Sequence, residues 1–412
     1  MKKVTFAAVA VVSVGLLALA GCSKKEGSSA ASSSSSSSSA AEKVELTVWE
    51  SLSGPDEFIK QAGAKYHETH SNVTIKYVNV ELGDAAGQIA LDGPAGVGAD
   101  LFAAPHDKLG ELVNGGHVAP TVDPTEVANS VLGACVTALT ATNGKMYGYP
   151  VSAETYALFY NREFISDDEV PTTWEGLKDW VIDFNGSHPG KRGFVMDVGN
   201  AYYSIIFTTA NGNRLFGKSG ADTSSTYLNT PDSVEGMKFF QSLRAALDVP
   251  AGDLPTGNCD GAFQGGTAAM HITGLWNIVN FENAGLDFGV APLPALPGES
   301  TPSASFSGTR AMFVSAYTDY PDEAADFAKF LISEDMQKLR FDITGAMPSI
   351  QVQVSSPYIG GFLEQLEYAF PMPSIPEMGT FWMALGSASA NIWNGSDVQK
   401  ELDACDKTIL GS

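Results

Sequence analysis

The chain has 412 residues, of which 44% are hydrophobic and 17% charged, and its formal net charge is −23. Residues 1–41 contribute four lysines and one glutamate, so residues 42–412 carry −26, a charge that repels phosphate backbones and argues against a nucleic-acid partner. The same stretch is long enough for two domains of ordinary size, each with a substantial core.

The first residues have the pattern of an export signal. Lys2 and Lys3 precede an uncharged, mostly apolar run from Val4 to Ala20. At about 17 residues this run is shorter than the roughly 20 that a membrane-spanning helix needs, and no later segment is apolar and uncharged for as long. We therefore expect a signal peptide over residues 1–21 and a soluble mature protein.

The run ends in Leu19-Ala20-Gly21-Cys22, which resembles a bacterial lipobox. The resemblance implies cleavage before Cys22 and lipid attachment to that residue, so the membrane would be contacted through the lipid anchor only. The mature protein would then lie on the outer face of the cell membrane.

Residues 22–41 are expected to form a flexible linker. They include eight consecutive serines, Ser32 to Ser39, and no aromatic or branched apolar residue, so they cannot offset the entropy lost on ordering. A flexible linker of about 20 residues reaches roughly 25 Å on average. A domain on this linker could still contact a membrane partner.

Strands and helices alternate from residue 44 onward. Strands are predicted at Val44–Trp49, Val73–Val80 and Asp100–Ala104, and helices at Pro55–Thr69, Asp84–Leu91 and Asp107–Asn114. Such alternation predicts an α/β fold with a mostly parallel, doubly wound sheet. Ligands of these sheets bind at the carboxyl ends of the strands, which are the loops after Trp49 and Ala104.

The second half contains further helical patterns and one irregular segment. Helices are predicted at Thr173–Phe184, Pro231–Leu247 and Pro321–Ile332. The Pro/Gly-rich segment Ala291–Gly308 precedes an apolar strand at Ala311–Ser315, and it is more typical of a crossing between lobes than of a core element.

The remaining cysteines, Cys135, Cys259 and Cys405, are far apart and show no metal-like spacing. One disulfide with a free thiol and three buried thiols are both compatible with this pattern.

Enzyme and metal motifs are weak or missing in this sequence. There is no Gly-x-Ser-x-Gly elbow and no His-Glu-x-x-His helix, and the loop from Gly93 to Gly98 lacks the lysine and spacing of a phosphate-binding loop. His67 and His70 lie one turn apart and could share a metal ion, but a solvated helix face is the simpler interpretation. We expect no metal, no cofactor and no catalytic residue.

The aromatic residues of the second half are the most informative feature. Tyr202, Tyr203, Trp276 and Trp382 lie beside glycine or other small residues rather than within a long periodic helix face. Sugar rings present an apolar C–H face and a polar rim, so a sugar site needs aromatic plates together with carboxylates or amides. Each ring taken alone is more typical of a core position than of a sugar platform.

Several segments, in the same order along the chain, resemble the maltose/maltodextrin-binding proteins of bacterial ABC importers. They are Leu46–Trp49, Ala99–Lys108 with its His-Asp-Lys, Asn143–Glu154, Leu158–Arg162, Pro171–Glu175, Ala262–Trp276 and Met372–Trp382. The pattern Phe-x-x-Gly-x-Ala-Ala-Met…Gly-x-Trp is shared by many sugar-binding relatives. His-Asp-Lys and Met-Pro-x-Ile-Pro-x-Met…Phe-Trp are narrower and point to the maltodextrin branch.

The resemblance implies a two-lobed periplasmic-binding-protein fold that closes around an oligosaccharide by a hinge motion. The first lobe would comprise residues 42–153 and 307–355, and the second residues 154–306 and 356–412. The implied sugar ligands are Ser51, Asp107, Lys108, Glu154, Asn200, Tyr202, Tyr203, Trp276, Met372 and Trp382. The implied partners are a maltodextrin and the permease subunits of an ABC transporter, and we expect a monomer.

The sequence also departs from the family. Ala104 stands where the family has a tryptophan, Asn200 where it has a glutamate and Gly386 where it has an arginine, while Ser51, Ser53 and Gly54 replace polar residues of the first lobe. These changes predict a groove that is open at one end and favours maltotriose or longer chains.

Two other functions remain open from the sequence. One is a binding protein for a different oligosaccharide. The other is a secreted glycoside hydrolase, which needs two carboxylates about 5 to 10 Å apart, and Asp107 and Glu154 could be read as such a pair.

Overall fold

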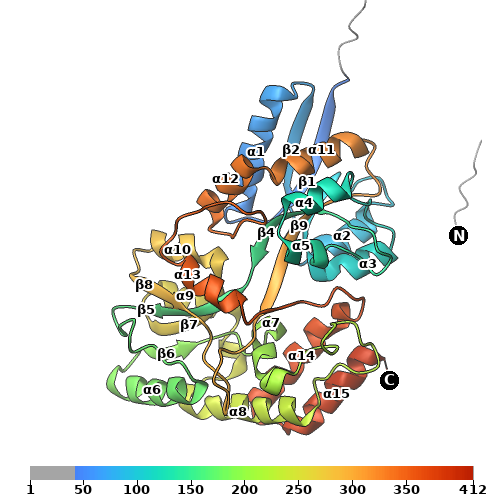
Figure 1. Cartoon of the computed structure of the whole chain (residues 1–412). Coiled ribbons are helices and arrows are strands. Elements are labelled where there is room, and N and C mark those ends of the chain that lie inside the picture. Colours follow the sequence, from blue (N-terminus) through green and yellow to red (C-terminus); the bar gives the residue numbers. More distant parts are fainter. Residues whose placement is uncertain (1–41, 412) are drawn as a thin grey trace, which may run out of the picture. The chain divides into compact units, whose positions relative to one another are not determined.

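The computed structural model describes residues 42–411, which form one compact unit with two β-sheets (Figure 1). The predicted signal peptide, Cys22 and the serine-rich linker lie outside the described residues. Each sheet has its own hydrophobic core, and we call the six-stranded sheet with its helices the first lobe and the four-stranded sheet with its helices the second. The predicted residue boundaries of the lobes stay a prediction.

The first sheet has the strand order β10-β9-β3-β1-β2, and β4 also pairs with β9. Its strands are β1 (Val44–Glu50), β2 (Val73–Asn79), β3 (Leu101–Pro105), β4 (Tyr149–Glu154), β9 (Phe306–Val314) and β10 (Phe370–Pro371). Its helices are α1 (Pro55–Thr69), α2 (Ala85–Asp92), α3 (Leu109–Asn114), α4 (Pro124–Ser130), α5 (Gly133–Ala138), α11 (Pro321–Leu331) and α12 (Glu334–Thr344).

Helix α1 shows how local sequence builds this lobe. Pro55 occupies the first turn, where its missing N–H costs nothing, and two acidic residues in that turn complement the helix dipole. The helix packs closely on β2, because a side chain at Gly63 would bring a Cβ within 2.8 Å of the Ile75 Cβ. The predicted bounds of α1 are confirmed.

The second sheet has the strand order β6-β7-β5-β8. Its strands are β5 (Tyr156–Asn161), β6 (Arg192–Val195), β7 (Ala268–Gly274) and β8 (Phe288–Ala291). Its helices are α6 (Trp174–Ser187), α7 (Ala201–Ser204), α8 (Pro231–Leu247), α9 (Thr256–Gln264), α10 (Ile278–Asn283), α13 (Ile359–Leu366), α14 (Met378–Trp393) and α15 (Val398–Leu410).

The prediction of mostly parallel sheets is wrong for the second lobe. There β6 pairs with β7 in parallel, but β5 is antiparallel to both β7 and β8, and in the first sheet β9 is antiparallel to β3 and β4. The reason is that β5 and β9 carry the chain from one lobe into the other. β5 enters the second sheet, and β9 the first, at the end where the neighbouring strands finish.

Strand β9 is longer than the predicted strand at Ala311–Ser315, because it begins at Phe306 within the segment that was expected to be irregular. Phe306 packs in the core of the second lobe, whereas Ala311 to Val314 pack in the core of the first. The expected crossing between lobes is therefore present, and it is a continuous strand that Figure 1 shows running between the two sheets.

The structure shows the surroundings of the three cysteines and of the His67–His70 pair. Cys135, Cys259 and Cys405 are free and buried. His67 contacts the backbone oxygen of Val73 at 2.6 Å and His70 stacks on Tyr66, and residues 42–411 contain no cluster suited to a metal ion. Among the same residues, no helix has the length and apolarity needed to cross a membrane.

Two helical glycines provide a test of this packing. Gly236 of α8 is buried, and a Cβ there would lie 2.0 Å from the carbonyl oxygen of Phe207, whereas nothing lies within 4 Å of a Cβ at Gly186 of α6. We expect Gly236→Ala to lower the free energy of unfolding by about 1–3 kcal/mol through overpacking. Gly186→Ala should raise it by up to about 1 kcal/mol, because alanine favours the helix.

Urea denaturation of both variants measures the two free energies. A Gly236→Ala protein as stable as the wild type would contradict the close approach of α8 to the segment that contains Phe207.

Candidate functional site

The residues proposed from the sequence lie where strands end or just beyond. Ser51 follows β1, Asp107 and Lys108 lie in the short helix η1 (His106–Lys108) after β3, and Glu154 ends β4. In the second lobe, Asn200, Tyr202 and Tyr203 follow β6, and Trp276 lies in η5 (Leu275–Asn277) after β7. Met372 follows β10 and Trp382 belongs to α14. Strand ends are where open α/β sheets bind ligands.

Asp107 links the two lobes through a hydrogen bond. Its side chain is buried, and its Oδ2 accepts a hydrogen bond from Trp382 Nε1 at 3.0 Å. Its Oδ1 is buried and accepts no hydrogen bond from the described protein groups. Burial raises the pKa of Asp107 to about 6, although the charge of Lys108 and the Trp382 hydrogen bond act in the opposite direction. A buried carboxylate oxygen without a donor is suited to accept from a ligand hydroxyl.

His106 holds the position of Asp107 and was missed by the sequence analysis. Its Nδ1 accepts from the Thr309 N–H at 3.1 Å, so its Nε2 carries the proton and donates to the Met372 carbonyl at 3.0 Å. Burial lowers the pKa of His106 to about 4, which keeps the ring neutral and able to make both bonds. Its place in the His-Asp-Lys motif was the signal that could have identified it.

Three of the proposed aromatic residues come together. The ring of Tyr202 lies 6.2 Å from that of Trp276 and 6.4 Å from that of Trp382, measured between centroids, and all three are only partly buried. The Trp276 indole lies against Gly274, where a Cβ would meet Cζ3 at 2.0 Å, so a side chain at that position would displace the ring. The ring of Tyr203 also lies 5.4 Å from that of Tyr202, but Tyr203 is buried in the core, so it differs from the three partly exposed rings.

The remaining members of the proposed site contact other protein groups. Met372 and Glu154 both lie beside Gly308, within 3.4 Å and 3.6 Å of a Cβ built there, and Glu154 accepts a hydrogen bond from Ser152 Oγ at 3.0 Å. Lys108 Nζ lies 3.8 Å from Glu111. The Asn200 side chain caps α7 by accepting from the Tyr202 N–H, so its oxygen already has a structural partner.

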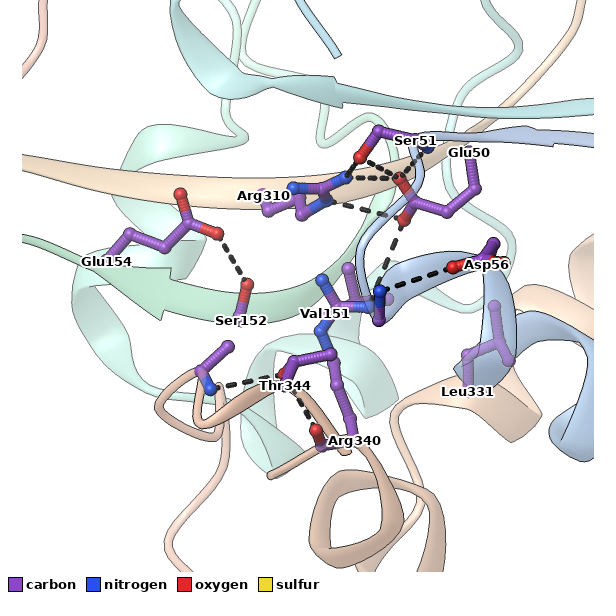
Figure 2. Close-up of polar contacts among 12 residues, drawn as sticks. Glu50, Ser51, Asp56, Val151, Ser152, Glu154, Arg310, Leu331, Arg340 and Thr344 are labelled. Atoms are coloured by element: carbon purple, nitrogen blue, oxygen red, sulfur yellow. Dashed lines mark hydrogen bonds and ion pairs between the residues drawn. The ribbon is translucent and has the colours of Figure 1, made fainter. Parts of the chain in front are cut away.

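Ser51 belongs to a buried ionic cluster, which Figure 2 shows. Glu50 is fully buried and forms an ion pair with Arg310, and Arg310 Nη2 donates to Ser51 Oγ at 2.6 Å. Arg340 Nη1 lies 3.9 Å from Glu50, but its Nε and Nη1 have no hydrogen-bond partner among the described residues. Burial, and then the charge of Arg310, lower the pKa of Arg340 to about 10.

Glu50, Arg310 and Arg340 were not predicted from the sequence. The available signal was a charged residue next to an apolar strand run: Glu50 after Val48-Trp49, and Arg310 before Ala311-Met312-Phe313. Charged residues in such positions are rarely buried unless they are paired.

Two departures from the family do not open the groove as expected. Ala104 is fully buried in β3 opposite Ala311, and a Cβ at Gly386 would lie 2.7 Å from the carbonyl oxygen of Gly199. Both positions are packed against their neighbours. The expectation that they empty one end of the site is therefore wrong.

This chain is similar to known solute-binding proteins. A family described as bacterial extracellular solute-binding protein matches residues 61–358. The galactooligosaccharide-binding protein of Bacillus subtilis is 30% identical over 96% of this chain and 94% of its own length. A maltooligosaccharide ABC transporter solute-binding lipoprotein of Streptococcus pneumoniae is 28% identical over 91% of this chain and 89% of its own.

The fold is that of a solved relative. The maltotriose-binding protein of Thermus thermophilus, bound to maltotriose, superposes with a TM-score of 0.81 over 89% of this chain and 99% of its own, at 28% identity. The two-lobed α/β fold predicted from the resemblance is confirmed. The chain therefore belongs to the bacterial extracellular solute-binding proteins, which bind solutes and are not enzymes.

Proposed function

We propose that this protein binds α-1,4-linked gluco-oligosaccharides of three or more units between its lobes and delivers them to the permease of an ABC transporter. The observation that carries the proposal is the pairing of Asp107 with Trp382. A buried carboxylate, with one oxygen that lacks a donor, lies beside three partly buried rings. Rings for the sugar face and a carboxylate for its hydroxyls are the two elements that a sugar site requires.

The proposed ligand set keeps Asp107, Lys108, Glu154, Tyr202, Trp276, Met372 and Trp382 as direct contacts. Ser51, Asn200 and Tyr203 keep supporting roles, because each is engaged by neighbouring protein groups or is buried. We further propose that Cys22 carries the lipid anchor on the outer face of the membrane, with the protein a monomer. The name of the pneumococcal relative as a lipoprotein supports the lipid anchor.

A galactooligosaccharide is the second candidate ligand. The relative from Bacillus subtilis that carries this name is 30% identical over nearly the whole chain. Galactose and glucose units share the apolar ring face and differ in the orientation of a hydroxyl, so the rings alone do not discriminate between them. Titration with both classes of sugar therefore discriminates between the two candidates.

Removal of a ring tests the aromatic platform. We expect Trp276→Ala and Trp382→Ala each to weaken maltotriose binding by about 2 kcal/mol or more, as central aromatic anchors usually do. Trp382→Phe should weaken it less, because a ring remains although the donor to Asp107 is lost. Trp180→Ala, which removes a partly buried indole from α6, serves as the control and should leave the affinity unchanged.

Calorimetry gives the affinities and a thermal melt gives the stability of each variant. A large loss of stability with unchanged affinity for maltotriose would identify the two tryptophans as core residues instead.

The raised pKa of Asp107 leads us to expect opposite effects of pH on sugar affinity and on stability. The ionised carboxylate accepts hydroxyl hydrogen bonds, so we expect sugar affinity to fall as the pH drops below about 6, by up to about tenfold per pH unit. Stability behaves oppositely. Because the folded pKa lies above the ordinary value of 3.8, the folded protein holds its proton more tightly, and stability decreases as pH rises between about 4 and 6.

Calorimetry and urea denaturation between pH 4.5 and 7.5, at about half-unit steps, measure both trends. Asp107→Asn should bind more weakly at pH 7 and lose both pH dependences in this window. If the variant retains the wild-type pH dependence of affinity, another group titrates, and Asp107 is not the carboxylate that binds the sugar.

Chain length is the third test. Each glucose unit that reaches a ring adds apolar contact, while the loss of rigid-body freedom is nearly the same for a disaccharide and a longer chain. We expect maltotriose or longer chains to bind at least about tenfold more tightly than maltose, a difference of about 1.4 kcal/mol. Titration of glucose, maltodextrins from maltose to maltoheptaose, cyclodextrins and galactooligosaccharides checks this.

Equal affinities for maltose and maltotetraose would contradict the preference for longer chains. Tighter binding of a galactooligosaccharide than of any maltodextrin would favour the second candidate.

A further inference from the structure

We propose that Arg310 is a positioning residue that determines sugar affinity, because its side chain fixes the end of β1 and the loop after it beside β3 and β4, the strands that lead to Asp107 and Glu154. This inference rests on the proposed function. In β9 the register places Arg310 opposite Pro105 of β3 on one side and opposite Ser152 of β4 on the other. Pro105 lies two residues before Asp107, and Ser152 two residues before Glu154.

The side chain of Arg310 reaches the end of β1. Its Nη2 donates to Glu50 Oε1 and, at 2.6 Å, to Ser51 Oγ, while its Nε donates to Glu50 Oε2 at 3.3 Å (Figure 2). Glu50 Oε1 in turn accepts from the Ser51 N–H at 2.8 Å. The planar guanidinium therefore fixes both the carboxylate that ends β1 and the first residue of the loop after it.

The charge balance ties Arg310 to Glu154 as well. Burial opposes the charge of the guanidinium, yet Glu50 and Glu154 raise the pKa of Arg310 above its ordinary value. With Arg340 also beside Glu50, the three buried groups carry a net positive charge, which the carboxylate of Glu154 offsets. Loss of Arg310 would leave Glu50 and Glu154 with a single guanidinium that makes no hydrogen bond to either carboxylate in the described structure.

Arg340 does not duplicate this role. It approaches Glu50 only through Nη1 at 3.9 Å, and its guanidinium lies over the ring of Phe58 at 5.2 Å. Its contribution to the position of Ser51 is electrostatic, whereas Arg310 bonds directly to both residues. We therefore assign the positioning role to Arg310 alone.

A double variant can distinguish the effect of Arg310 on stability from its effect on sugar affinity. Removal of one partner of a buried ion pair leaves an uncompensated charge, whereas replacement of both partners by neutral groups of similar size is often tolerated. Arg310→Met should therefore lower both stability and affinity. Combined with Glu50→Gln, it should recover most of the stability but still bind maltotriose at least about tenfold more weakly than the wild type, since Arg310 no longer fixes the end of β1 or offsets the charge of Glu154.

The experiment measures urea midpoints and maltotriose affinity by calorimetry on the full chain. It compares the wild type, Arg310→Met, the double variant Glu50→Gln/Arg310→Met, and Arg310→Lys, which keeps the charge but loses the planar fork. The matched control is Arg162→Met/Asp167→Asn, which removes an exposed ion pair of the second lobe and should leave affinity unchanged.

Wild-type affinity in a stable double variant, or in Arg310→Lys, would overturn the proposal and leave Arg310 a structural residue only. The Arg310→Lys variant retains the charge and keeps the test valid even if the double variant fails to fold. Failure of the proposed function is recognised separately, because in that case the wild type itself binds no maltotriose, and the positioning role falls with it.

Discussion

Strand β9 is the element on which both lobes depend, because its backbone and its side chains belong to two cores at once. Phe306 at its start packs among the residues of the second lobe, and Ala311 to Val314 pack in the first. Between them, Arg310 and the N–H of Thr309 bond to groups that hold the ends of β1 and β3. A strand in this position cannot shift by one residue without moving buried side chains to the wrong face.

The polar groups that contact this strand are buried and therefore need hydrogen-bond partners. His106 meets that requirement as a neutral ring that accepts from Thr309 and donates to Met372. Glu50 meets it with a guanidinium and a backbone N–H. Buried polar networks of this kind specify one arrangement, because each lost partner leaves a group that water cannot reach. The ends of three strands are in this way held in a defined relation beside the aromatic group.

The side chains proposed to meet the sugar show the opposite pattern. Oδ1 of Asp107 accepts no bond from the described residues, and Tyr202, Trp276 and Trp382 are only partly buried. A binding site needs ligand-contacting groups that are still free to bond, surrounded by groups whose hydrogen bonds are already made. The surrounding groups hold the free acceptors and ring faces in place, so binding loses less entropy. The bond between Asp107 and Trp382 also joins the lobes directly, so a bound sugar would lie among groups from both.

The sequence by itself determined the features that depend on local chemistry. Pro55 and the acidic residues after it mark the start of α1, and the resemblance correctly implied the family and the two-lobed fold. It also directed attention to Asp107 and the tryptophans, because their motifs are short and contiguous. The start of β9 was not predicted, because the serines and Gly308 near it are locally typical of a loop. They form a strand only because they pair with other segments.

Only the tertiary structure decided which of these residues are free to act. Tyr202 and Tyr203 are neighbours in sequence, yet one joins the ring group and the other is buried, because a helical turn directs adjacent side chains to different faces. The pairing of Glu50 with Arg310 joins residues 260 positions apart. No local periodicity encodes such a contact, which arises from the way the chain crosses between its lobes and returns.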